Sequence, residues 1–131
     1  MNEQEFKDRT KKLAVRVIRL VDALPKTTAA EIVGKQLLRF ATSVGANYRA
    51  ACRGKSTADV INKLSIVEEE ADESLYWLEI LAESDLMPEN RLCELKQEMN
   101  EILAMIVASL KTLRAKIQNP KSKIQNAEIR P

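Results

Sequence analysis

Two long segments in the second half of the chain repeat apolar or small residues at intervals of three and four. The first segment carries Val60, Leu64, Val67, Ala71, Ser74, Leu78 and Leu81. The second carries Leu92, Leu95, Met99, Ile102, Ile106, Leu110, Leu113 and Ile117. This spacing is the period of one face of an α-helix and comes close to a heptad repeat. It favours long helices that each bury one side against other helices.

The first half of the chain shows the same period, interrupted by residues that end or begin helices. A first helix is expected from about Glu3 to Leu24, because Pro25 disfavours helical geometry in the residue before it. Thr27 or Thr28 is suited to cap a second helix, which should run to about Arg53. Both halves of the chain are therefore expected to be helical.

Gly54 is suited to stop the second helix, and Ser56 with Asp59 has the spacing of a capping box at the start of a third. Pro88 suits the first turn of a fourth helix. Because such short connections favour antiparallel neighbours, the sequence predicts an all-α fold, an antiparallel up-down-up-down four-helix bundle over residues 1–118. Residues 119–131 are polar and include Pro120, so we expect a disordered tail there.

The composition argues against an enzyme. The chain has no His and only 3 Gly, which leaves no His base, no His-containing metal site and no phosphate-binding Gly loop. Cys52 and Cys93 are expected to be buried thiols, since nothing in the chain resembles an export signal. Glu69 with Glu73 is a remote option for a metal, because such pairs are common on solvated helix faces. We expect no catalytic residue, metal or cofactor.

The apolar runs are all far shorter than the roughly 20 residues that span a bilayer. We therefore expect a cytoplasmic protein without a membrane partner. The net charge of +2 says little about partners, because the charges are unevenly distributed along the chain.

An acidic block in the third helix faces the second helix across the turn at Gly54. In an antiparallel hairpin Arg39 should lie near Glu70, with Glu69 and Glu73 within about one helical turn, roughly 5.4 Å. We expect these residues to form structural ion pairs that fix the register. Gly45 costs about 1 kcal/mol in mid-helix relative to Ala, which indicates that the facing helix approaches closely there.

Up-down topology gathers the starts of the first and third helices with the ends of the second and fourth, and this end of the bundle is basic. The residues expected to contact nucleic acid are Arg9, Lys12, Arg16, Arg49, Arg53, Lys55, Lys111 and Arg114. Clustered cations can hold a phosphate backbone without reading its sequence. The alternative is a solvated surface whose cations complement helix C-termini.

Several apolar residues lie off the expected core stripes. They are Tyr48, Tyr76, Trp77 and Ile80. A small bundle cannot bury every face of its helices, so these residues are expected at a subunit interface. Broad core-facing helices are the alternative.

Three segments, Gln36–Arg39, Ser43–Asn47 and Lys55–Asp59, together resemble the four-helix-bundle family of 23S rRNA intervening-sequence proteins. The resemblance covers about Phe6 to Lys116. Many members of that family have Ile-Ala-Glu-Gly after the Asn, where this chain has Tyr-Arg-Ala-Ala at residues 48–51. The chain resembles a subgroup that carries Asn-Tyr-Arg-Ala and the acidic block.

This resemblance implies an up-down bundle that assembles as a homopentamer. It also implies kinship with the accessory variability proteins of diversity-generating retroelements, which bind nucleic acid and a reverse transcriptase. We therefore expect a non-enzymatic homo-oligomer that contacts structured RNA, ribosomal RNA among the options, through its basic end. The alternative is a protein-interaction scaffold or accessory subunit, with a retroelement reverse transcriptase as a candidate partner.

Overall fold

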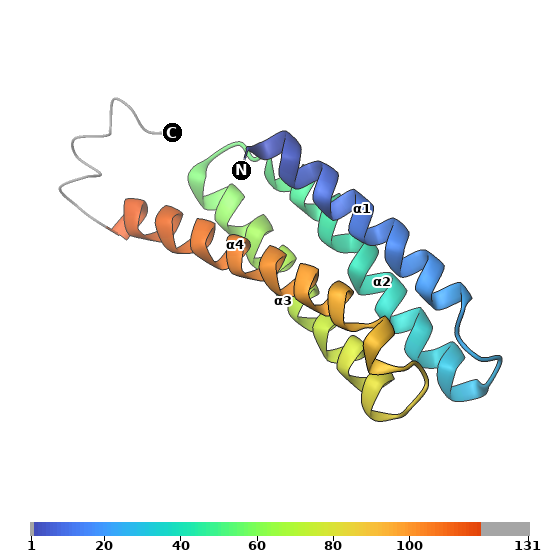
Figure 1. Cartoon of the computed structure of the whole chain (residues 1–131). Helices are drawn as coiled ribbons and strands as arrows, with labels where there is room; N and C mark the ends of the chain where they lie inside the picture. Colours follow the sequence, from blue (N-terminus) through green and yellow to red (C-terminus); the bar gives the residue numbers. More distant parts are fainter. Residues whose placement is uncertain (1, 119–131) are drawn as a thin grey trace.

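The structure is a computed structural model that describes residues 2–118. The helices in chain order are α1 (Glu3–Asp22), α2 (Thr28–Ala51), α3 (Thr57–Glu83), the short 3₁₀ helix η1 (Glu89–Arg91) and α4 (Cys93–Gln118). Successive long helices run in opposite directions (Figure 1). The predicted all-α four-helix fold is confirmed, whereas the predicted tail lies outside the described residues.

The polar residues before each helix set where it starts. Asn2 and Glu5 form a reciprocal capping box at α1, with bonds of 2.8 and 3.0 Å. Thr27, one of the two predicted caps, accepts a hydrogen bond from the Ala30 amide at the start of α2. Ser56 accepts from the Asp59 amide at the start of α3, as predicted. These bonds satisfy backbone donors that have no partner within the helix.

The start of α4 differs from the prediction. Pro88 is extended, with φ −61° and ψ 142°, and precedes η1 instead of opening the fourth helix. The backbone amide of Leu92 donates a hydrogen bond to the Glu89 carbonyl at the end of η1, and α4 begins one residue later. Leu92, the residue between the two helices, is fully buried in the core.

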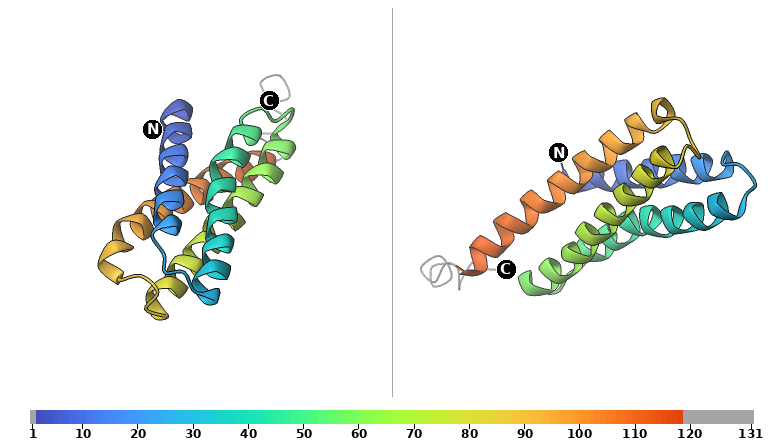
Figure 2. Two further views of the ribbon diagram at one scale, coloured as in Figure 1. Left: turned by 90° about the vertical axis from the view of Figure 1, so that its right-hand side faces the viewer. Right: turned by 90° about the horizontal axis from the view of Figure 1, so that it is seen from below.

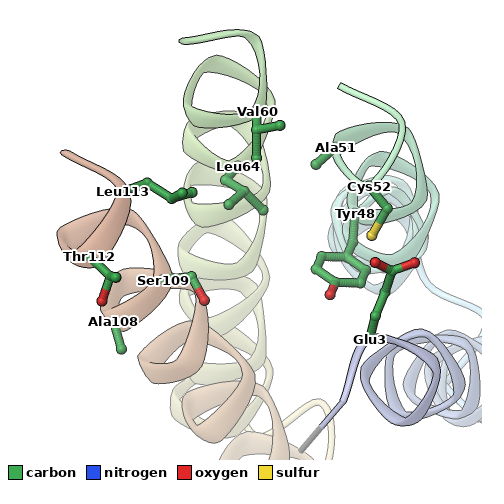
Figure 3. A pocket seen from close by; sticks show the side chains of 10 residues that line it. All are labelled: Glu3, Tyr48, Ala51, Cys52, Val60, Leu64, Ala108, Ser109, Thr112 and Leu113. Carbon is green, nitrogen blue, oxygen red and sulfur yellow. The ribbon is translucent and has the colours of Figure 1, made fainter. Parts of the chain in front are cut away.

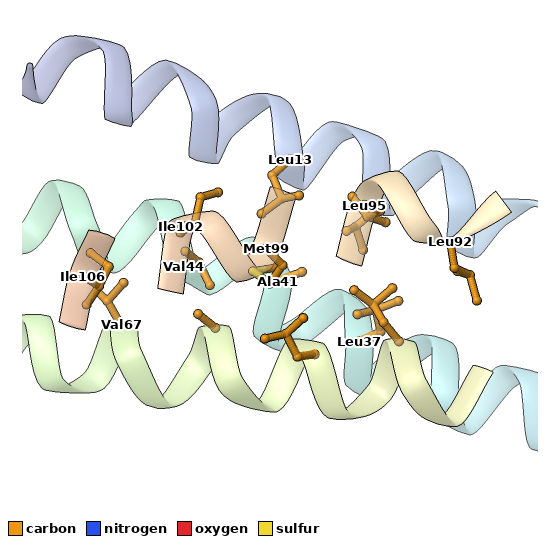
Figure 4. Packing of buried hydrophobic residues seen from close by; sticks show 14 of the residues in the cluster. Leu13, Leu37, Ala41, Val44, Val67, Leu92, Leu95, Met99, Ile102 and Ile106 are labelled. Atoms are coloured by element: carbon orange, nitrogen blue, oxygen red, sulfur yellow. The ribbon is translucent and has the colours of Figure 1, made fainter. Parts of the chain in front are cut away.

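The core lies between the four long helices (Figure 4). Its fully buried members with the largest side chains are Leu13, Val17, Leu37, Val44, Val67, Leu78, Leu81, Leu92, Met99, Ile102, Ile106 and Leu110. The stripes predicted for the third and fourth helices supply most of these residues. α1 packs mainly against α2 and makes a smaller contact with α4, whereas α3 packs against both α2 and α4. α1 and α3 therefore lie diagonally across the bundle.

Gly45 marks a close contact, as predicted, but with a different helix. A Cβ atom at this position would meet Thr10 Oγ1 at 3.0 Å and Thr10 Cβ at 3.2 Å. Thr10 is buried in α1, where its hydroxyl donates to the backbone carbonyls of Phe6 and Lys7. The approach is therefore between α2 and α1, whereas the hairpin geometry placed Gly45 opposite α3.

The bundle opens toward the end of α4. Figure 2 shows α4 diverging from α1 and α2 as it approaches its C-terminus. A groove of about 560 Å³ runs into this end and is lined by residues from all four long helices. This open end is also the end predicted to be basic.

Candidate nucleic-acid interface at the open end

Cations from α1 and α2 surround a small surface hollow at the open end. Its lining comprises Gln4, Lys7, Asp8, Lys11, Arg49 and Arg53, and its volume is about 180 Å³. We call this site the basic hollow. Lys7 forms an ion pair with Glu3 at 3.0 Å, whereas Lys11, Arg49 and Arg53 have no ion pair among the described residues.

Helical spacing explains why these side chains meet. Lys7 and Lys11 are one turn apart on α1, and Arg49 and Arg53 are one turn apart at the end of α2. Cations at a helix C-terminus also complement the negative end of its dipole. Lys7 and Lys11 belong to the end expected to be basic but were not among the residues expected to contact nucleic acid, although their spacing and their place beside the end of α2 favour that role.

Arg9 belongs to a different site. Its guanidinium donates to Glu98 at 2.8 and 2.7 Å and to Glu101 at 2.8 Å, which ties α1 to α4. The hydrogen bonds from Arg9 lower the pKa of the Glu98 carboxyl. We therefore remove Arg9 from the predicted nucleic-acid contacts, because two carboxylates already neutralise it. The sequence pattern offered no reason to pair it with α4.

The remaining predicted cations spread over several surfaces. Lys12 and Arg16 line a shallow depression on the outer side of α1. Lys55 is exposed at the α2–α3 turn, where its backbone amide donates to Asp59 and lowers the pKa of that carboxyl. Lys111 is exposed on α4. Arg114 donates to Ser65 on α3 at 3.0 Å. Of the predicted set, the basic hollow brings together Arg49 and Arg53.

The groove separates the end of α4 from α1 and α2 (Figure 3). Tyr48 points from α2 toward α4, across from Ser109, and Leu64 of α3 forms the floor. Burial raises the pKa of the Tyr48 hydroxyl and of the Cys52 thiol. A thiol held in its neutral form is a poor nucleophile. Cys52 is half-buried and Cys93 is exposed, so the prediction that both thiols are buried is wrong.

The predicted ion pairs of Arg39 do not form. Arg39 donates to Gln36 at 2.9 Å and stacks over the Phe40 ring at 4.5 Å. Glu70 instead accepts two bonds of 2.8 Å from the Asn47 amide. Asn47 lies about two helical turns further along α2 than Arg39. The register expected from a hairpin that turns at Gly54 is therefore off by about two helical turns at this pair.

Burial raises the pKa of Glu70, whereas Glu69 and Glu73 are exposed and have no ion pair in the described part of the chain. Between residues 2 and 118, no group of three or more metal-ligating side chains gathers around a common point. The acidic block is therefore divided into one inward carboxylate and a solvated outer row.

The four predicted interface residues occupy different environments. Tyr76 is 52% exposed. Trp77 and Ile80 are half-buried, and the Trp77 ring meets Tyr76 edge-on at 5.0 Å. Tyr48 packs against Phe6 with ring centroids 4.5 Å apart and faces the groove. The outward placement predicted for Tyr48 is therefore wrong, because the divergence of α4 opens space for its ring inside the bundle.

None of the helices in the described part combines the length and the apolar character that a bilayer crossing requires.

Residues 2–108 match the profile of the family described as 23S rRNA-intervening sequence protein. The match begins before Phe6 and stops short of Lys116, the limits expected from the resemblance. The chain is also similar to a crystal structure of a protein of unknown function from the S23 ribosomal protein family of Bacteroides thetaiotaomicron, with 34% identity and a TM-score of 0.78. That similarity covers 85% of this chain and 99% of the other. No curated protein matches the chain.

Proposed function

Since the chain belongs to the family of 23S rRNA-intervening sequence proteins, we propose that it is a non-enzymatic, oligomeric bundle that contacts structured RNA through the basic hollow. Ribosomal RNA is the first candidate ligand. The expected cytoplasmic location, the absence of a cofactor and the pentameric state implied by the resemblance are parts of the same proposal.

The observation that carries this proposal is the convergence of cations from two helices on one hollow. Lys11, Arg49 and Arg53 line it without an ion-pair partner in the described residues. Lys7 also lines it and forms an ion pair with the exposed carboxylate of Glu3. Positive groups held on two rigid helices can bind successive phosphates of a backbone. Arg also presents a planar fork of donors that matches phosphate geometry.

Assembly would strengthen such binding. Each copy in a symmetric oligomer presents the same hollow, so several weak contacts act together on one large RNA. The second contact then occurs at a high effective concentration, which raises the overall affinity without any new interaction.

A second candidate function is a protein-interaction scaffold or accessory subunit, with a retroelement reverse transcriptase as its candidate partner. It is favoured by the outer side of α3, where exposed Glu69 and Glu73 accompany Tyr76. An acidic surface of this kind repels RNA and suits a basic protein surface.

The direct test is RNA binding by fluorescence anisotropy, with a labelled hairpin RNA at low salt. We expect the double variant Arg49→Glu/Arg53→Glu to lose about tenfold or more in affinity, because it reverses both of the positive charges that the C-terminal end of α2 contributes to the hollow. The matched control is Lys26→Glu/Lys35→Glu, which makes the same charge change at exposed positions toward the other end.

The control variant should bind the hairpin nearly as well as the wild type. Failure of the wild-type protein to bind RNA even at low salt would contradict the proposal. Equal losses in both double variants would also contradict it, since they would reflect net charge and not a site.

A further inference from the structure

The basic hollow and the groove lie on two sides of the same end of α2. Arg49 and Arg53 line the hollow, whereas the residues that precede them in sequence, Tyr48 and Cys52, line the groove. Successive residues point about 100° apart around a helix. The last turns of α2 therefore present cations to one site and an aromatic ring to the other.

Glu3 at the start of α1 connects the two sites. Its side chain lines the groove and forms the ion pair of 3.0 Å with Lys7, which lines the hollow. The hydrogen bond from Lys7 lowers the pKa of the Glu3 carboxyl, so Glu3 is a charged acceptor at the boundary. A ligand that occupies both sites passes this ion pair.

The groove is built around the ring of Tyr48. This residue lines both the groove of about 560 Å³ and an adjoining lobe of about 300 Å³. Phe6 packs against the ring, with centroids 4.5 Å apart, and Figure 3 shows the ring directed into the open space that faces α4. Both volumes fall in the range of small-ligand sites, roughly 300–1,000 Å³.

The groove combines apolar walls with a few polar groups. Leu64 and Leu113 are among its apolar residues. Ser109 and Thr112 bring two hydroxyls from α4, and neither hydroxyl forms a hydrogen bond within residues 2–118. A hydroxyl both donates and accepts, whereas the Glu3 carboxylate accepts only. These groups suit a planar ligand whose faces are apolar and whose edge carries donors and acceptors.

We propose that the groove receives an unpaired base of the RNA whose backbone lies in the basic hollow. The inference rests on the proposed RNA contact and narrows its ligand to RNA with unpaired bases. The base stacks on Tyr48, and its edge meets the hydroxyls of Ser109 and Thr112. Unstacked bases are commonly held on aromatic side chains and read along their edges in this way.

The neighbouring charges favour a base over other occupants. A nucleotide in the groove leaves its phosphate beside Arg49 and Arg53, which neutralise it. An apolar segment of a protein would cover Tyr48 but would leave the Ser109 and Thr112 hydroxyls without partners. A base within a duplex is paired and stacked, so duplex RNA reaches the hollow and not the groove.

The test compares two labelled RNAs by fluorescence anisotropy, a hairpin with an unpaired loop and the blunt duplex of its stem. Wild-type protein should bind the hairpin about tenfold more tightly, the effect of stacking one base on an aromatic ring. Tyr48→Leu should abolish this preference because it removes the ring. Tyr48→Phe should retain most of it.

A second variant tests the groove without altering Tyr48 or the hollow. Ala108 is exposed on α4 and lines both the groove and its adjoining lobe, so Ala108→Leu fills the space that the base needs. It should bind the hairpin about tenfold more weakly and the duplex as the wild type does. The matched control is Ala104→Leu, at an exposed position one turn earlier and outside the lining.

Arg49→Glu/Arg53→Glu should weaken the binding of both RNAs by the same factor, because it acts on the backbone contact alone. Circular dichroism would verify that every variant is helical, and sedimentation velocity would measure its molar mass.

Equal affinity of the wild-type protein for hairpin and duplex would overturn the inference and leave the RNA contact standing. Absence of binding to either RNA would overturn both. Ala108→Leu would overturn the inference if it kept the preference for the hairpin, or if it weakened the binding of both RNAs equally. A change in molar mass caused by Ala108→Leu would overturn it in favour of a contact between copies at the groove.

Discussion

At the end of the bundle that holds the α3–α4 connection, Leu81 and Leu92 are fully buried and Met87 nearly so, whereas at the opposite end Tyr48 and Leu64 line an open groove. The first end is fixed by apolar packing. The second combines incomplete packing with the basic hollow. Apolar packing is therefore concentrated at one end of the four helices, and the basic hollow lies at the other.

The backbone reinforces the packed end. The amides of Leu86 and Met87 both donate to the Leu81 carbonyl, at 3.1 and 3.3 Å. Asp85 adopts a positive φ of 60° to make this turn, a conformation that Asp tolerates better than most side chains. These two bonds satisfy the Leu81 carbonyl near the end of α3. Met87, which follows the turn, is buried in the core.

The largest expected effect is at the packed end. Leu92→Ala should lower the free energy of unfolding by about 4 kcal/mol, because it leaves a cavity that the surrounding residues cannot fill. Urea denaturation followed by circular dichroism would measure it. A loss below about 1 kcal/mol would show that this end is not the main source of stability.

A Leu→Ala substitution at the groove should lower the free energy of unfolding by a smaller amount. Leu64→Ala is expected to lower the free energy of unfolding by about 2 kcal/mol, since the space left behind joins the groove instead of forming a closed cavity. The matched pair of Leu→Ala variants therefore compares the two ends with identical chemistry. An equal or larger loss for Leu64→Ala would remove the distinction between them.

The ion pairs of Arg9 with α4 should have a smaller effect, and one that depends on pH. Glu98→Gln should lower the free energy of unfolding by about 1 kcal/mol at neutral pH. Arg9 lowers the folded-state pKa of Glu98 below its ordinary value of 4.5. The ionised carboxylate therefore stabilises the fold above about pH 4.5, and this contribution is lost as the pH falls through the folded-state pKa.

Denaturation of the wild type and Glu98→Gln at several pH values would check this prediction. The stability difference between them should shrink toward zero in acid. A difference that grows as the pH falls would have the wrong sign and would exclude the ion pairs as its cause.

The fold was largely predictable from the sequence, because the stripes from Val60 to Leu81 and from Leu92 to Leu110 are long and regular. Thr27 and Ser56 also revealed their helix starts. Contacts between polar side chains were not predictable in the same way. The partners of Glu70 and Arg9 depend on where α2 and α4 lie along their neighbours, and a shift of two turns replaces Arg39 with Asn47.

The site was predicted only in part for a related reason. The up-down topology predicts that one end of the bundle is basic. Which of its cations are free to bind a ligand depends on the ion pairs that each cation forms with nearby carboxylates. Arg9 is engaged by Glu98 and Glu101, whereas Arg49 and Arg53 remain unpaired within the described chain. Helical spacing alone does not distinguish these cases, because the partner carboxylates lie far along the chain.

The salt dependence of RNA binding tests the central claim most directly. The slope of log affinity against log salt concentration reports how many phosphates the protein neutralises. Wild-type protein should show a steep negative slope, and Arg49→Ala/Arg53→Ala should reduce its magnitude by about two for each bound copy. An unchanged slope in the double variant would contradict the assignment of the basic hollow as the RNA-contacting site.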